Sequence, residues 1–203
     1  MTPFTIVESR AIPLALANVD TDQLIPARFM KRPRSEGYGA FLLHDLRAEQ
    51  GNEAQRLDDP VFAGASVLVA RRNFGSGSSR EAAVYALADF GIRCVLAPSF
   101  GDIFASNAAK NGLVPAQISE ADAESLLSDS TLRHGGILTV DLAAQTVRVG
   151  NHVITFDIES VWKTQLLNGW DDIDMTNSHS AAIQTFVECD VMQRPWAKPS
   201  MPR

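Results

Sequence analysis

The chain has 203 residues, which is enough for one sizeable hydrophobic core but too few for several domains of ordinary size. Hydrophobic residues make up 45% and charged residues 21%, so the composition excludes a mainly disordered chain and a coiled coil. The 18 basic and 24 acidic residues give a net charge of −6, which disfavours a nucleic-acid partner because such partners need a dominant positive field.

The sequence also lacks the usual signals for membranes and for disulfide frameworks. No segment approaches the roughly 20 consecutive apolar residues of a transmembrane helix, and the first residues lack the basic and then apolar pattern of a secretory signal. We therefore expect a cytoplasmic protein. Its two cysteines, Cys94 and Cys189, form no CxxC pair and are too few for a four-thiolate cluster, so we expect no metal on this chain.

The first 60 residues predict one strand followed by a long irregular segment. Residues 1–30 are typical of a short strand, a turn over 18–22, and an apolar Leu-Ile-Pro-Ala stretch. Residues 31–60 are rich in Gly, Arg, Asp and Glu with weak periodicity, and loops of this length are usually functional or mobile. We therefore predict a flexible loop at about 31–60, which is a candidate lid.

The next segment predicts a strand–helix–strand unit. The runs 65–71 and 92–97 are short, apolar and rich in β-branched residues, as in buried strands. Between them, Ser78 and Glu81 have the spacing of a capping box, which predicts a helix with Ser78 as its N-cap. Gly91 is well placed to end that helix. Two strands joined by a helix at this spacing indicate a parallel pair.

The remainder of the chain continues this pattern and then changes it. Three short runs after residue 136, separated by turn signals, indicate an antiparallel meander. The further predicted elements are helices over about 103–111, 119–127, 158–168 and 178–192, and strands over 113–116, 137–142, 146–150 and 153–158. The predicted fold class is therefore α/β, with a parallel βαβ core, an added antiparallel meander and C-terminal helices.

A Gly- and Ser-rich turn over residues 73–80 carries the strongest chemical signal. It links a strand end to a helix start, where free backbone N–H groups and the helix dipole can bind an anion. Gly77 lets a ligand approach the backbone, and Arg80 can add a bidentate contact to a carboxylate. The turn lacks the Lys-Ser/Thr pair of a P-loop, and Arg80 stands where a dinucleotide fingerprint has its third glycine. The alternative is an ordinary tight turn with Ser78 as a helix cap.

Four motifs occur in the order and spacing of a known family. They are Asn-Val-Asp-Thr-Asp-Gln-Leu-Ile-Pro at 18–26, Gly-Ser-Gly-Ser-Ser-Arg-Glu at 75–81, Pro-Ser-Phe-Gly-Asp-Ile-Phe at 98–104, and Lys-Asn-Gly-Leu-Val-Pro at 110–115. Together they resemble the small subunit of 3-isopropylmalate dehydratase, whose chain is similar to the swivelling C-terminal domain of aconitase. The likeness extends to Arg194-Pro195-Trp196. It implies a single swivelling β/β/α domain over residues 1–203.

The resemblance implies a two-subunit hydro-lyase of leucine biosynthesis, which interconverts 2-isopropylmalate and 3-isopropylmalate by dehydration and rehydration. In that family the large subunit carries a [4Fe–4S] cluster that acts as a Lewis acid, so the expected partner is a cluster-bearing large subunit. Matched residue by residue, Ser78 corresponds to the catalytic serine of aconitase and Arg80 to its substrate-carboxylate arginine. Ser79 and Gly77 are expected to support substrate binding.

A basic segment over residues 28–34 contains four cations and no acid. A doubly charged malate needs cations besides Arg80, so we expect Lys31 and Arg32 to contribute to substrate binding. The alternative is that the segment is a solvated loop face.

Two features bear on the identity of the substrate. In the family, a Gly-aromatic-Gly loop is implicated in recognising the alkyl group, so Tyr38, Phe41 and Leu42 either contact an isopropyl group or pack the loop against the protein. Ala82 replaces a histidine that is usual in the family, and Ser76 stands where cysteine is common. Two alternatives therefore stay open: a related hydro-lyase of the citraconate/citramalate or homoaconitate type, and a noncatalytic anion-binding or assembly paralogue.

Overall fold

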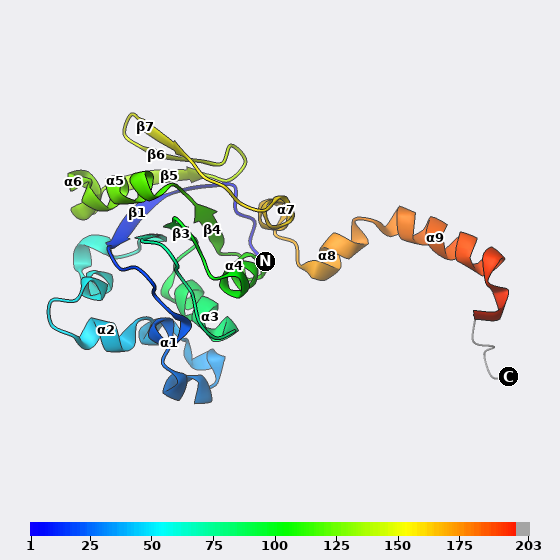
Figure 1. The fold of residues 1–203 in the computed structure, drawn as a ribbon, viewed down its shortest axis with the longest axis horizontal. Coiled ribbons are helices and arrows are strands. Elements are labelled where there is room, and N and C mark those ends of the chain that lie inside the picture. The colour runs from blue at the N-terminus through cyan, green and yellow to red at the C-terminus, as the bar shows by residue number, and fades with distance from the viewer. Residues whose placement is uncertain (198–203) are drawn as a thin grey trace.

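The computed structural model describes residues 1–197, which form one seven-stranded mixed sheet with helices on both faces (Figure 1). The strand order is β4-β3-β2-β1-β5-β6-β7. Strands β4, β3, β2 and β1 are parallel to one another, whereas the pairs β1–β5, β5–β6 and β6–β7 are antiparallel. The strands are Ile6–Leu14 (β1), Val67–Ala70 (β2), Cys94–Ala97 (β3), Val114–Gln117 (β4), Ile137–Asp141 (β5), Thr146–Val149 (β6) and His152–Thr155 (β7). The predicted α/β class, with a parallel core and an antiparallel meander, is confirmed.

The five predicted helices are present, and four short helices were not predicted. The α-helices are Thr21–Leu24 (α1), His44–Ala48 (α2), Glu81–Phe90 (α3), Asp102–Lys110 (α4), Glu120–Ser128 (α5), Ser130–Arg133 (α6), Ser160–Asn168 (α7), Asp172–Asn177 (α8) and Ser180–Gln193 (α9). Helices α1, α2, α6 and α8 were not predicted, because helices of four to six residues are too short to show a helical repeat.

Strand β1 joins the two halves of the sheet. Its first part, Ile6–Arg10, pairs antiparallel with β5 and is partly exposed, whereas Ala11–Leu14 pairs parallel with β2 and is buried. The parallel half therefore lies inside the protein, and the meander lies at its edge. This contrast is expected, because parallel strands are usually covered on both faces and antiparallel ones on one.

Strand β2 is buried between two hydrophobic clusters. Leu68 and Ala70 belong to the cluster formed with α1, α2 and α3, while Val67 and Val69 belong to the cluster formed with α5, α6 and the meander. Successive side chains of a strand point to opposite faces, so a strand covered on both sides needs an apolar residue at every position. This is why the sequence shows a continuous apolar run here.

The segment 31–60 has local structure and packs against the core. Short helical turns occupy most of it, in pieces of three to six residues that are too short to produce helical periodicity in the sequence. Tyr38 is buried; its hydroxyl donates to the Arg32 carbonyl (2.8 Å) and its amide donates to the Asp89 carboxylate on α3 (2.9 Å). The predicted irregularity is confirmed, while the mobility of the segment stays a prediction.

The capping box predicted at Ser78 is wrong. Helix α3 begins at Glu81, and its N-cap is Arg80, whose side chain makes no capping hydrogen bond. The non-helical turn continues as far as Arg80, so Ser78 is too far from the helix to be its N-cap. Gly77 has a left-handed φ of 95°, and the backbone of Arg80 is still extended. The predicted end of α3 at Gly91 is confirmed. The Ser78 hydroxyl is therefore not used to cap the helix.

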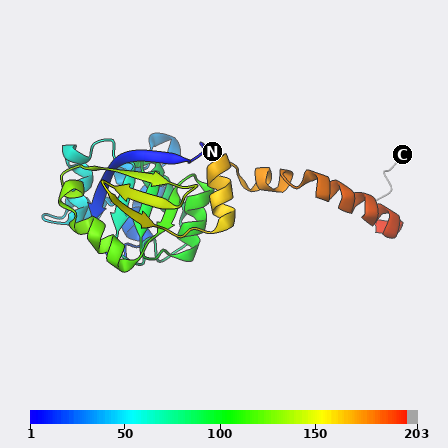
Figure 2. The ribbon, with the colours of Figure 1, turned by 90° about the horizontal axis from the view of Figure 1, so that it is seen from above.

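Helices α8 and α9 extend away from the body of the protein (Figure 2). No residue of α9 is buried, and Phe186 and Trp196 keep 66% and 78% of their surface exposed. Despite this apolar surface, no helix in the described part of the chain is both long and apolar enough to cross a membrane.

Candidate active site

The Gly- and Ser-rich turn lies where the loops after three parallel strands meet. The loops that follow β1, β2 and β3 are joined by two isolated backbone bridges, Asp20 to Ser76 and Phe74 to Phe100. The carboxyl ends of parallel strands share one edge of the sheet, which is the usual place for a ligand site in α/β folds. The three motifs at 18–26, 75–81 and 98–104, far apart in sequence, are therefore neighbours in space.

Side chains reinforce the junction between these loops. Asn18 and Asn73 both have positive φ, a backbone conformation that asparagine tolerates better than most residues. The Asn73 amide side chain donates to the Asn18 side-chain oxygen (2.9 Å), and its backbone N–H donates to the Ser99 hydroxyl (2.9 Å). One residue thus holds all three loops together.

Thr21 fixes the shape of the turn and is a residue that the sequence analysis missed. It is 2% exposed; its hydroxyl donates to the Ser78 carbonyl (2.9 Å), and its backbone N–H donates to the Ser76 carbonyl (2.9 Å). Because the Ser76 and Ser78 carbonyls point toward Thr21, the backbone N–H groups between these carbonyls point away from it. The signal in the sequence was a threonine between two aspartates in a turn, which is too weak to assign a role.

A cavity of about 160 Å³ lies against this turn. It is lined by Thr21, Gly75, Gly77, Ser78, Arg80, Gly101, Asp102, Ile103 and Phe104. Gly77, Ser78 and Arg80 were predicted as site residues, and the structure brings them together. The start of α4 at 101–104 was part of a recognised motif but had no predicted role.

The cavity has the electrostatics of an anion site. Both α3 and α4 begin at it, and neither start is capped by a side chain. Within residues 1–197, the amides of Gly77, Ser78 and Ser79 donate to no acceptor, and the Ser78 hydroxyl makes no hydrogen bond. Two helix dipoles and several free N–H groups favour negative charge near the Ser78 hydroxyl, whereas Asp102 at the start of α4 adds one carboxylate to the same lining.

Arg80 adds the positive side chain of the cavity. Its guanidinium forms an ion pair with Asp22 of α1, and its side chain is only 19% exposed. Asp20, two residues before, instead caps α1 by accepting from the Gln23 backbone N–H (2.7 Å). The first aspartate of the motif is thus structural, whereas the second orients Arg80.

Comparison with known proteins assigns the chain to a family. The family model of the aconitase C-terminal domain matches residues 1–121. The 3-isopropylmalate dehydratase small subunit of Afipia carboxidovorans is 43% identical over 200 residues, which cover 97% of this chain and 100% of that one. The chain belongs to the 3-isopropylmalate dehydratase small-subunit family. The small subunit of Methylobacterium radiotolerans is 44% identical over 201 residues, with the same coverage.

A solved structure agrees with this assignment at the level of the fold. The crystal structure of 3-isopropylmalate dehydratase from Methanocaldococcus jannaschii matches with a TM-score of 0.66 at 24% identity, covering 89% of this chain and 98% of that chain. The swivelling α/β fold expected from the resemblance is therefore confirmed.

The other predicted site residues lie outside the cavity. Ser79 is exposed and does not line it, and the same holds for Lys31 and Arg32. Arg32 instead lies over the ring of Phe41, with its guanidinium carbon 5.4 Å from the ring centroid. A role for Ser79, Lys31 and Arg32 in binding substrate stays a prediction. For that role, the family's other subunit would have to bring these residues and the cavity into one site.

The basic segment at 28–34 is largely neutralised by acids from elsewhere in the chain. Its ion pairs are Arg28 with Asp45, Arg32 with Glu36 (3.7 Å) and Arg34 with Asp89 (3.5 Å). The hydrogen bond from Arg28 lowers the pKa of the Asp45 carboxyl to about 2, so this pair is charged on both sides at neutral pH. The sequence shows no acid inside the segment, because Glu36 lies just beyond its end and the other two acids, Asp45 and Asp89, are distant in the chain.

The residues considered for alkyl recognition mostly pack the insertion against the core. Tyr38 and Leu42 are buried, while Phe41 is partly exposed and stacks on Phe29 with ring centroids 4.3 Å apart. The two departures from the family pattern also lie outside the cavity: Ala82 packs against the core at the start of α3, and Ser76 does not line the cavity. Neither departure changes the cavity lining.

The two cysteines are poorly placed to bind a metal together. Cys94 is fully buried in β3, where burial raises the pKa of its thiol well above the usual range, and Cys189 is exposed on α9. Among the residues that the structure describes, no group of three or more His, Cys, Asp or Glu side chains is arranged to hold a metal ion.

Gly75 is the glycine on which the cavity depends most. It has a φ of 73°, and a Cβ atom there would lie 2.1 Å from the Cγ of Phe104. Phe104 is buried, lines the cavity, and packs edge-to-face on Phe74 with centroids 5.5 Å apart. Any side chain at Gly75 must therefore displace a core aromatic ring.

We expect Gly75→Ala to lower the free energy of unfolding by about 2–4 kcal/mol, the sum of a left-handed backbone penalty and overpacking. Gly64→Ala is the matched control, because Gly64 has a φ of 74° and nothing within 4 Å of its Cβ position. It should lose only about 1 kcal/mol. Urea denaturation of both variants measures the difference; equal losses would show that Phe104 adapts without cost.

Proposed function

We propose that this chain is the small-subunit half of an active site that interconverts 2-isopropylmalate and 3-isopropylmalate, with Ser78 and Arg80 as its reacting and binding groups. One observation carries the residue-level proposal: an anion-binding cavity in which the free Ser78 hydroxyl, Arg80 and the starts of two helices meet. The small-subunit names of the relatives support the reaction.

Ser78 is proposed to take up and return the proton on the carbon next to a substrate carboxylate. A free serine hydroxyl is too weak an acid to be ionised near neutral pH, so the site must stabilise its alkoxide. The uncapped starts of α3 and α4 and the unused amides at 77–79 are the groups that can do so, because they place partial positive charge at the cavity before the reaction begins.

Arg80 is proposed to bind a carboxylate of the substrate. Its planar guanidinium can bind one carboxylate with two parallel hydrogen bonds, and Asp22 holds it in place through the ion pair. The substrate carboxylate would share the guanidinium with Asp22. Binding at Arg80 orients the substrate so that the carbon that loses its proton lies toward Ser78.

The cavity is too small to be a complete substrate site. Small-molecule sites usually enclose about 300–1,000 Å³, whereas this one has about 160 Å³. A shared site fits this size, and the small-subunit family implies a large-subunit partner. We propose that the large subunit completes the site and holds the [4Fe–4S] cluster, which would supply the Lewis acid for removing the substrate hydroxyl. The cytoplasmic location stays a prediction.

The proposal predicts that activity needs both subunits. The chain alone, incubated anaerobically with iron and sulfide, should show no cluster absorption and no turnover, because it offers only one exposed thiol among its described residues. Adding the reconstituted large subunit should produce interconversion of the two isopropylmalates. Citraconate and homoaconitate are measured in parallel. A complex that prefers either of these, or that turns over none of them, would contradict the proposed function.

A further inference from the structure

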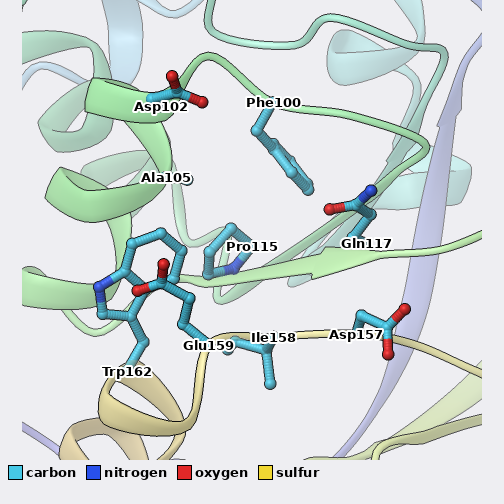
Figure 3. A pocket seen from close by; sticks show the side chains of 9 residues that line it. All are labelled: Phe100, Asp102, Ala105, Pro115, Gln117, Asp157, Ile158, Glu159 and Trp162. Atoms are coloured by element: carbon cyan, nitrogen blue, oxygen red, sulfur yellow. The ribbon is translucent and has the colours of Figure 1, made fainter.

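A second cavity, of about 500 Å³, lies between α4, β4 and the start of α7. It is lined by Phe100, Asp102, Ala105, Pro115, Gln117, Asp157, Ile158, Glu159 and Trp162 (Figure 3). One side is held firmly, because Gln117 and Asp157 exchange two backbone hydrogen bonds of 3.0 and 2.7 Å. The cavity is therefore a fixed feature of the fold, formed by segments that are distant in sequence.

The lining of this cavity combines aromatic surface with uncompensated negative charge. Figure 3 shows Phe100, Pro115 and Trp162 along its wall and the carboxylates of Asp102, Glu159 and Asp157 spaced around it. Within residues 1–197, none of these three carboxylates forms an ion pair or a side-chain hydrogen bond. A dicarboxylate substrate would be repelled here. The chemistry instead suits an extended cation, whose alkyl stem or plane packs on the rings while its charge meets the carboxylates.

The position of the cavity indicates where such a cation would come from. Asp102 lines both this cavity and the smaller one that contains Ser78 and Arg80. The two cavities therefore adjoin at the start of α4, so a partner surface that covers the smaller cavity would lie next to the larger one.

We propose that the large subunit inserts a basic side chain, an arginine or a lysine, into this aromatic and acidic cavity when the two subunits assemble. This inference rests on the proposed function, because it takes the partner to be the large subunit. Arginine suits the site best, since its planar guanidinium can stack on Trp162 or Phe100 while donating to a carboxylate. Burial of a paired charge beside the active site would fix the relative position of the two subunits.

The test compares subunit association for the double variant Asp157→Asn with Glu159→Gln against the unaltered chain. Glu159 precedes α7 but its side chain makes no capping hydrogen bond, so the change removes charge without removing a cap. Titration calorimetry with the reconstituted large subunit should show a Kd raised by about tenfold or more, with a weaker dependence on salt. At saturating large subunit, kcat should be unchanged. Glu8→Gln, an exposed acid on β1, is the matched control and should leave Kd unchanged.

The outcomes separate this inference from the proposed function. An unchanged Kd in the double variant, with an active unaltered complex, would overturn the cavity assignment and leave the proposed function intact. An inactive unaltered complex would count against the proposed function, whatever the Kd. N-acetylarginine amide is titrated into the isolated chain as a free probe. If it bound tightly through the two acids while subunit association did not change, the cavity would belong to a small organic cation and the inference would be wrong.

Discussion

Replacing Ser78 with alanine is expected to lower the kcat of the assembled enzyme by about 10³- to 10⁴-fold and to leave KM nearly unchanged. The reason is that the hydroxyl would exchange a proton with the substrate in the transition state, whereas the cavity amides and Arg80 that bind the ground state would remain. Steady-state kinetics on the reconstituted complex, at matched large-subunit occupancy, measures both constants.

The structure allows a second readout that distinguishes catalysis from helix capping. An N-cap serine replaced by alanine typically costs about 1 kcal/mol of stability. Since Ser78 does not cap α3, Ser78→Ala should change the free energy of unfolding by less than about 0.5 kcal/mol. Ser79→Ala is the matched control, because Ser79 is adjacent and exposed but does not line the cavity. Near-normal turnover in Ser78→Ala, or equal losses in both variants, would refute the catalytic role.

Arg80→Lys is expected to raise KM by about 10- to 100-fold with a smaller effect on kcat. Lysine keeps the positive charge but cannot form the two parallel hydrogen bonds to a carboxylate, so the loss reports the geometry of the guanidinium and not its charge. Initial rates over a range of isopropylmalate concentrations separate the two constants.

The control for this prediction is Arg72→Lys. Arg72 is an exposed arginine on the same loop and does not line the cavity, so its replacement should leave KM unchanged. Because the Arg80 pair with Asp22 is partly exposed, Arg80→Lys should cost less than about 1 kcal/mol of stability. A parallel fall in kcat with no change in KM would place Arg80 in the transition state alone and contradict its role in ground-state binding.

Local patterns in the sequence were sufficient to predict most of the fold. The run Val67–Ala70 is apolar at every position because both of its faces are covered, and the runs near 137–155 alternate because one face is open. The start of α3 was misplaced because Ser78 and Glu81 match a capping box by spacing alone. The positive φ of Gly77, which moves the helix start to Glu81, depends on the neighbouring loops and is not encoded in that spacing.

The candidate site was only partly predictable, for a different reason. Ser78 and Arg80 were found because they lie within one motif, whereas the hydroxyl of Thr21 acts across 57 positions of sequence. At the basic segment, the local sequence indicated unpaired positive charge, whereas Arg34 pairs with an acid 55 residues away. Contacts of this range are decided by the pairing of strands and the paths of loops, which no single segment of sequence specifies.

The bridges that tie together the loops after β1, β2 and β3 have a consequence for how the two subunits meet. Because Asp20 pairs with Ser76 and Phe74 with Phe100 within this chain, the loops around the cavity are already fixed before any partner arrives. Ordering a loop on association costs conformational entropy, which is subtracted from the affinity of a complex. Here that entropy is lost when the small subunit folds, so the contacts made at the subunit boundary can contribute to affinity without being offset by loop ordering in this region.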